Sequence, residues 1–569
     1  MKTIFITQKP HRAGSALLIT MVMLGVALII LAGVLSWSAT STRLTYRSIQ
    51  YTRSVAAAEA ATEKVVSQIS HDFLYYGEDT VINNLNSYRN VVPLSSDSAY
   101  WSTWQFNDAS GNANQTYVQR ENSVSYTNVD PPYNNLHGNI STYTVVSDAK
   151  DTASPQDLTV GVRQQLQLLT IPIFQYALFS SGNMEISCGQ PFDITGPVHS
   201  NGHLYVEPDS SMTFESEVGA VLDVLFSRDP FDTRGHPAGG VTYVEHALGQ
   251  PQSGVPFLTL PIGTDNTPEA VREIIEPPPP GGDIPGSAII QLRYYNNCDM
   301  LVTVSDTGVT ASINHSATTI PTDELMTFVS ITNNFYDGRE GKTVRPIDLN
   351  IGNLVTWGTT NTHLLNPSSV YVDDRRTPLT LSASDLGAVR VVNGATLPPN
   401  GLTVATGRPL YVWKDYNSDS ANRGTANTSF TQPASLVADA ITILSDGWHD
   451  NYGSSPPHNA TATTVNAAFL TGVVETTLGH YSGGMENFPR FLETWTGVKF
   501  TYNGSMVKMF PSLYATNVWR GSYYDPPVRI WAFDTNFRDP TRLPPKTPSV
   551  LKVFRHQWAT LPPGQTVAP

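Results

Sequence analysis

The chain has 569 residues, of which 40% are hydrophobic and only 14% are charged, with 41 Gly and 41 Pro. This length predicts several structural units, and low charge with many turn formers indicates an extracellular β-rich protein rather than a cytosolic helical enzyme. Residues 1–71 hold seven Lys/Arg against two Asp/Glu, and the remainder holds 27 against 46. Nucleic-acid binding depends on Lys and Arg that neutralise phosphates, so the acidic remainder argues against it.

The N-terminal region contains an uncharged apolar run from Ala16 to Trp37. The run is about 22 residues long, and about 20 suffice to cross a bilayer. Three interpretations compete for it. The first is a plain membrane anchor, and the second is a secretory signal peptide cut near Ser36-Trp37-Ser38, for which the apolar core is too long. In the third, the cut falls before the run, between Gly14 and Ser15, and the apolar helix stays in the mature protein.

Gly14, Ser15, the apolar start after them and the Ala57-Ala58-Glu59-Ala60 block resemble the N-terminus of the type IV pilin superfamily. The resemblance is to PilX-type minor pilins and to the tip pseudopilin of type II secretion, here on a large β-rich ectodomain. Major pilins carry Glu at the fifth mature position, where this chain has Ile19. That difference argues against a major subunit and is tolerated in tip-type subunits, which need no preceding subunit to pair with.

The resemblance implies partners and a location. The partners are prepilin peptidase, other pilin or pseudopilin subunits and the inner-membrane assembly platform. The location is a single pass of the inner membrane, with a cytoplasmic N-terminus and the bulk periplasmic or extracellular on a fibre. Basic residues flank the apolar run on both sides, so the positive-inside rule gives almost no bias. The short preceding flank also favours an N-terminus inside.

The predicted organisation begins with a leader peptide over 1–14 and one long helix over 15–71. At 1.5 Å per residue this helix is roughly 80 Å long. Residues 72–176 are predicted to form a small α+β region like a pilin head. Its strand signals are Tyr143–Val146 and Leu158–Val162, with turn chemistry between them.

The remaining chain is predicted to be mainly β. Short strand-sized pieces separated by Gly and Asn turns indicate a β-solenoid-like or β-sandwich head, although no strict period is visible. The predicted segments are solenoid-like 177–227, a Pro/Gly-rich linker or insertion 228–286, an α+β insertion 287–384, solenoid-like 385–510, and an aromatic and Pro-rich wrap 511–569. Within the insertion, we expect strands at Ala288–Leu292 and Leu301–Ser305 and a helix within Asp323–Thr332.

Two residue sets could carry covalent or metal chemistry. Cys188 and Cys298 could pair outside the cytoplasm, closing a loop of roughly 110 residues, or could be two buried free thiols. Asp415, Asn417 and Asp419 match the first three ligand positions of a calcium loop. The Gly and Glu that such a loop needs further on are missing, so an oxygen-rich turn competes with a calcium site. No other cofactor is expected.

Three carboxylates, Glu486, Glu493 and Asp534, could form the pair that glycosidases use, if two of them converge. The competing interpretation is that they cap turns or pair with neighbouring cations. The resemblance at the N-terminus implies a protein without enzymatic activity, a structural minor pilin or pseudopilin at the tip of a type IV pilus or type II secretion-like fibre. The alternatives are a membrane-anchored adhesin or carbohydrate-binding surface protein, and a polysaccharide-active enzyme.

Overall fold

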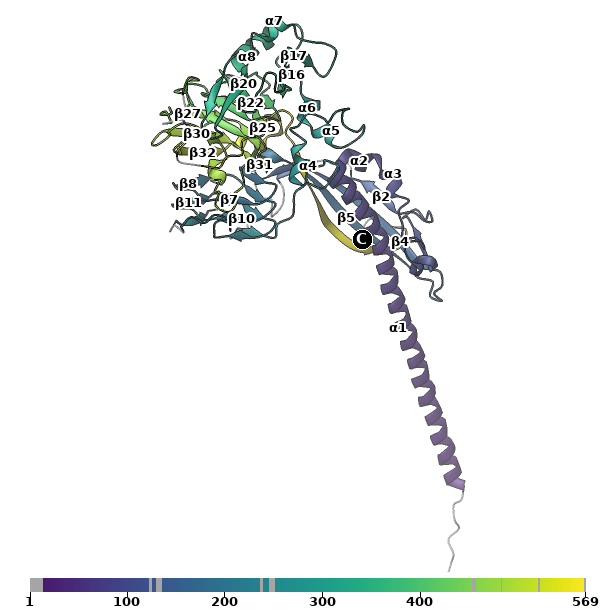
Figure 1. Ribbon diagram of the computed structural model, residues 1–569. Helices are drawn as coiled ribbons and strands as arrows, with labels where there is room; N and C mark the ends of the chain where they lie inside the picture. The colour runs from purple at the N-terminus through teal and green to yellow at the C-terminus, as the bar shows by residue number, and fades with distance from the viewer. Residues whose placement is uncertain are drawn as a thin grey trace, which may run out of the picture.

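The computed structural model describes residues 14–121, 125–128, 136–235, 239–244, 251–452, 457–482, 484–519 and 522–566. Residues 1–13, which hold most of the predicted leader, lie outside the described residues. The molecule has two parts: a stalk made of a long helix on an antiparallel sheet, and a head of stacked parallel strands (Figure 1). The predicted fold class, mainly β with a long N-terminal helix, is confirmed.

The first helix, α1, spans Gly14–Tyr76 and is 63 residues long. It projects from the molecule as a rod (Figure 1). No Pro interrupts it, and it ends where Gly77 takes a φ of 82° and donates its N–H to the Phe73 carbonyl. The helix runs past its predicted end at residue 71 because Phe73 is buried against the stalk sheet. Two short helices follow, α2 (Glu78–Asn83) and α3 (Leu85–Tyr88).

The stalk sheet has six antiparallel strands with β4 and β5 at its centre. Val65, Ile69 and Phe73 of α1 pack on it beside Tyr143 and Leu166. The last strand, β33, pairs with β5, so the chain end joins the stalk and does not wrap the head as predicted for 511–569. The strands are β1 (Trp104–Asn107), β2 (Tyr117–Arg120), β3 (Ser125–Asn128), β4 (His137–Asp151), β5 (Thr159–Pro172) and β33 (Ser549–Leu561).

The first part of the head, the N-terminal stack, is a set of parallel coils. Leu204 pairs with Met184 on one side and Val224 on the other, so successive coils repeat every 20 residues, a period that the sequence analysis did not detect. Its strands are β6 (Leu178–Ser180), β7 (Met184–Ile186), β8 (Phe192–Ile194), β9 (Val198–Ser200), β10 (Leu204–Val206), β11 (Met212–Phe214), β12 (Val218–Ala220), β13 (Val224–Leu225), β14 (Val241–Tyr243) and β15 (Gln252–Ser253).

The C-terminal stack is also largely parallel, but its coils differ in length because loops are inserted between strands. Its strands are β16 (Met300–Ser305), β17 (Gly308–Ile313), β18 (Val329–Ser330), β19 (Phe335–Asp337), β20 (Lys342–Asn350), β21 (Ser369–Asp374), β22 (Asp385–Val392), β23 (Leu402–Ala405), β24 (Leu410–Trp413), β25 (Ala434–Ala438), β26 (Ile441–Leu444), β27 (Thr463–Asn466), β28 (Ala468–Val473), β29 (Arg490–Phe491), β30 (Lys499–Gly504), β31 (Met506–Pro511) and β32 (Val528–Phe533).

The two stacks form one continuous structure whose chain starts in the middle. An eleven-stranded sheet runs in the order β15-β12-β9-β6-β31-β28-β25-β23-β21-β16-β17, so β6 lies beside β31. The chain enters at β6, runs outward to β15, crosses to the other end at β16, and returns to the middle at β31. One apolar core is shared by both stacks. Successive coils of the head pair in parallel.

The crossing between the stacks is packed and is not a free linker. Residues 228–286 contribute β14 and β15 to the N-terminal stack, and Val271 of α4 (Pro268–Arg272) and Ile275 just after this helix are buried. The predicted strand at 288–292 is wrong, since α5 (Ile289–Leu292) and α6 (Tyr294–Asn297) lie there. The predicted strand at 301–305 is confirmed as β16. At the far end, α7 (Thr322–Leu325) and α8 (Ile351–Thr360) lie near β17 (Figure 1).

Candidate functional site

The outer segment of α1, residues 15–49, exposes its apolar side chains. It is long and apolar enough to cross a membrane, and the predicted membrane segment Ala16–Trp37 lies wholly within it. The predicted processing residues Gly14 and Ser15 form its first turn, so a cut between them would leave the helix whole. The exposed large side chains of this segment include Leu17, Leu18, Met21, Met23, Leu24, Ile29, Ile30, Leu35 and Trp37.

Between the apolar run and the stalk sheet, α1 mixes polar residues with Leu44, Tyr46 and Ile49, and all of its residues are exposed up to Gln50, its first buried residue. Arg43, Arg47 and Arg53 are exposed in and just beyond this stretch. From residue 38 to 49 the helix covers about 18 Å at 1.5 Å per residue. This stretch is a continuous part of α1, and its exposed side chains leave room for neighbouring molecules.

The inner segment of α1, residues 50–76, is held by small side chains. Ala57, Ala58 and Ala61 are buried against Phe106 and Val162, and the absence of long side chains lets the helix approach the sheet closely. Polar contacts fix its register. Gln164 donates to the Thr62 hydroxyl (3.0 Å), Lys64 pairs with Asp97 (2.6 Å), and Arg555 of β33 pairs with Glu63. The predicted Ala-rich block is therefore the docking surface of the helix.

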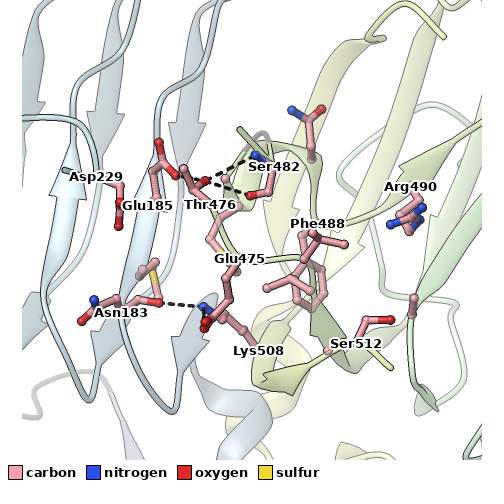
Figure 2. A pocket seen from close by; sticks show the side chains of 18 of the residues that line it. Asn183, Glu185, Asp229, Glu475, Thr476, Ser482, Phe488, Arg490, Lys508 and Ser512 are labelled. Atoms are coloured by element: carbon pink, nitrogen blue, oxygen red, sulfur yellow. Dashed lines mark hydrogen bonds and ion pairs between the residues drawn. The ribbon is translucent and has the colours of Figure 1, made fainter. Parts of the chain in front are cut away.

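The head contains a cavity of about 190 Å³ where the two stacks meet. Figure 2 shows Asn183, Glu185 and Asp229 from the N-terminal stack facing Arg490 and Ser512 from the C-terminal stack. Lys508 closes one side by donating to the Asn183 carbonyl (3.0 Å) and pairing with Glu475 (3.1 Å). Phe231, which is half exposed, and Glu475 lie at the solvent side, whereas Met485 and Phe488 are buried.

Two carboxyl groups near this cavity are held in a dry environment. Burial, followed by the charge of Glu486, raises the pKa of Glu185 to about 8. Burial also raises the pKa of Glu486, which accepts from the Tyr481 hydroxyl (2.9 Å) and the Ser187 N–H (3.2 Å). Arg234 stacks on the Tyr481 ring, 3.0 Å from its centroid. At neutral pH Glu185 therefore keeps its proton and acts as a hydrogen-bond donor as well as an acceptor.

The three candidate catalytic carboxylates do not converge in one site. Glu486 lies near the cavity, Glu493 accepts from the Ser445 N–H (2.7 Å) and hydroxyl, and Asp534 accepts from the Thr428 hydroxyl (2.7 Å). All three are buried, and burial raises the pKa of each. Each carboxylate accepts hydrogen bonds from protein groups of its own, which favours the alternative interpretation that the sequence allowed.

The predicted calcium residues have separate protein partners. Asp415 pairs with Arg423 and accepts from the Thr464 N–H (2.8 Å). Asn417 donates to the carbonyls of Gln432 and Asn466. Asp419 accepts from the N–H groups of Ala421 and Asn422 (2.8 and 2.7 Å). Within the described residues no group of three or more His, Cys, Asp or Glu is placed to hold a metal ion.

Cys188 and Cys298 are free and buried, which is the second of the two alternatives that the sequence left open. Cys188 belongs to the coil that starts with β6, whereas Cys298 precedes β16, six strands away in the long sheet. At about 4.8 Å per strand the separation is roughly 29 Å, far beyond the reach of a disulfide. Burial raises the pKa of both thiols to about 12, which leaves them protonated and unreactive.

Sequence reasoning missed two buried charges that organise the head. Asp439 pairs with Arg272 (2.7 Å) and accepts from the Ser512 hydroxyl and the N–H groups of Leu513 and Tyr514. Arg339 lies beside the cavity, is 3% exposed, and donates from Nε to the Asn517 carbonyl (3.1 Å). The partners of both residues are distant in the sequence, so no local signal could have identified these contacts.

Three kinds of comparison with known proteins were informative only for solved structures. No family model matches the chain, and no curated protein sequence matches it. Among solved structures, the chain is similar to the competence-associated pilin ComZ from Thermus thermophilus. The alignment covers 90% of this chain and 97% of that one, with 12% identity and a TM-score of 0.28. A TM-score at this level does not establish a common fold.

Proposed function

We propose that the protein is a membrane-anchored structural subunit of a pilus-like fibre, a minor pilin or pseudopilin. The observation that carries the proposal is the division of α1. Its outer segment exposes a continuous apolar surface, while its inner segment is fixed to the stalk sheet by Ala57, Ala58 and Ala61. Such a helix stays in a bilayer before assembly and moves into the helical core of a fibre afterwards, exchanging one apolar environment for another.

We place the subunit at the fibre tip. The head is far broader than the rod that carries it (Figure 1), and a head of this breadth would clash with neighbours in a close-packed fibre wall. Ile19 also stands where an acidic residue would pair with a preceding subunit. A tip subunit has no preceding subunit, so an apolar residue at this position costs it nothing.

The exposed arginines supply the polar contacts of assembly. Arg43, Arg47 and Arg53 lie beyond the apolar run and have no ion pair within the described chain. In a fibre these arginines pair with acidic groups of neighbouring subunits. The inner-membrane assembly platform brings those subunits together. Arg47→Glu is expected to reduce incorporation into fibres while leaving membrane insertion intact; incorporation at the wild-type level would remove this role.

The mature N-terminus tests the proposal directly. Mass spectrometry of the protein from cells with and without prepilin peptidase is expected to find a start at Ser15 only where the peptidase is present. Gly14→Val is expected to block the cut, and Gly25→Val, inside the run, serves as the matched control. A start near residue 39, or an intact Met1 in both strains, would exclude the pilin pathway and leave a secreted or plainly anchored protein.

A further inference from the structure

Arg339 lines the cavity between the two stacks and makes no ion pair with the part of the chain that the structure describes. Arg339 is 3% exposed, and its Nη1 has no hydrogen-bond partner among the described residues. The neighbouring Arg490 pairs with Glu340 instead. Burial, followed by the charge of Arg490, lowers the pKa of Arg339 only to about 10, so the guanidinium stays charged at neutral pH. A buried, partly unpaired charge is costly unless a partner arrives from outside.

The rest of the lining suits hydroxyl groups and one ring face. The Thr476 hydroxyl donates to Glu185 (2.8 Å) and lies 3.2 Å from the Ser482 hydroxyl, so both hydroxyls and a protonated carboxyl face the cavity together (Figure 2). Met485 and Phe488 add a buried apolar wall. The volume of about 190 Å³ is slightly larger than the ~150 Å³ cavity that holds benzene in an engineered protein, so one six-membered ring fits.

We propose that this cavity binds a small carboxylate that carries hydroxyl groups, of the size of one sugar acid. The carboxylate pairs with the Arg339 guanidinium, whose planar fork matches carboxylate geometry. The hydroxyls bond to Thr476, Ser482 and Glu185, and the C–H face of the ring lies on Phe488. A phosphate dianion fits less well, because Asp229 and Glu475 line the same cavity and repel a second negative charge.

The site is independent of the anchor and can be tested on the full chain in detergent. Isothermal titration with D-glucuronate and D-galacturonate is expected to give saturable binding of at least one of them. D-glucose, the methyl ester of the bound acid and inorganic phosphate are each expected to bind at least ten-fold more weakly. The ester differs from the acid only in its charge, so this comparison tests the carboxylate without changing the protein.

Variants then assign the contact. Arg339→Lys keeps the charge but loses the fork, and is expected to weaken binding of the sugar acid at least ten-fold. Arg423→Lys is the control, since Arg423 is exposed and pairs with Asp415 away from the cavity. Binding of the ester as tight as the acid, tighter binding of phosphate, no binding of either acid, or an unaffected Arg339→Lys protein would each overturn the proposal. If Arg339→Lys does not fold, the ester comparison decides.

Discussion

In the outer segment of α1, large apolar side chains are exposed along the whole length, whereas β25 and β26 of the C-terminal stack are buried at every residue. The head also encloses charged groups that pair with each other, as Arg390 shows by pairing with Asp348 and Asp450. Outside the cavity lined by Arg339, the packing of the head is therefore supplied by its own chain. The outer segment lacks its surroundings, and its stability in place depends on lipid or on other helices.

Asp439→Ala gives the largest expected effect and tests whether the head is self-contained. The change leaves Arg272 with Glu276 alone and removes the acceptor from the donors of residues 512–514. Loss of one partner of a buried ion pair costs about 3–5 kcal/mol. Urea unfolding followed by tryptophan fluorescence measures it. Asp446→Ala, at an exposed pair with Lys414, is the control and is expected to change stability by less than about 1 kcal/mol.

Leu24→Arg tests the opposite property of the outer segment. A charge at the centre of a membrane helix raises the free energy of membrane insertion by about 2.5–3.5 kcal/mol. The variant is therefore expected to be depleted from the carbonate-resistant membrane fraction. The melting temperature of the head is expected to stay unchanged, because Leu24 touches no part of it. Ser41→Arg, beyond the apolar run, is expected to remain in the membrane. If Leu24→Arg lowered the melting temperature of the head, the outer segment and the head would not be independent regions.

Ala58→Leu sharpens the boundary between the two segments of α1. Ala58 is fully buried under the stalk sheet, and extra methylene groups in a packed core cost about 1–3 kcal/mol. Ala56→Leu is the control, because Ala56 is exposed on another face of the helix. This change is expected to have no measurable effect on the docking of the helix. Limited proteolysis of the helix–sheet contact reads out the difference. Equal protection of both variants would show that the inner segment is not docked through this face.

Glu185→Gln tests the dry interior of the head through pH. The pKa of Glu185 is raised from 4.5 to about 8 by burial and then by the charge of Glu486, with Asp229 and Asp232 contributing further. An unfolded chain loses this proton above about pH 4.5, whereas the folded protein keeps it to about pH 8. The free energy of unfolding therefore falls as pH rises through this window and is level above it.

Thermal unfolding at pH 5.5 and pH 8 measures this effect. The melting temperature of the wild-type protein is expected to fall between pH 5.5 and pH 8. That of Glu185→Gln is expected to fall less, by a difference of ~2 °C or more. Burial lowers the pKa of His199 to about 4, which works in the opposite direction but only below pH 6.5. An identical pH profile in both proteins would mean that Glu185 is ionised in the folded head.

Arg555→Ala has the smallest expected effect. Arg555 of β33 pairs with Glu63 of α1 at the surface, where the arginine side chain is 66% exposed. Exposed pairs contribute about 0.2–1 kcal/mol, so unfolding of the stalk is expected to shift by less than this amount. The shift is expected to shrink further in 1 M salt. A larger effect would indicate that β33 depends on this contact for its docking.

Local patterns in the sequence predicted much of the fold. The strands at 184–186, 192–194, 198–200, 204–206 and 212–214 lie where alternation and Gly or Asn turns placed them. The pairing of β6 with β31 and of β5 with β33 joins residues more than 300 positions apart, and no local pattern encodes it. The same limit applies to the site, since Arg339 and Glu185 meet at one cavity only because the two stacks are joined there.

The entry of the chain at the middle of the head has a mechanical consequence. Both connections to the stalk leave from near the middle: β5 leads into β6, and the chain after β31 passes through β32 before it returns as β33. Strand β6 has neighbours on both sides, so tension that reaches it from α1 must shear two ladders of hydrogen bonds at once. An end coil would instead peel away one ladder at a time. Tension on the helix is thus divided between the two connections to the stalk, and it reaches the head near its middle rather than at an end coil.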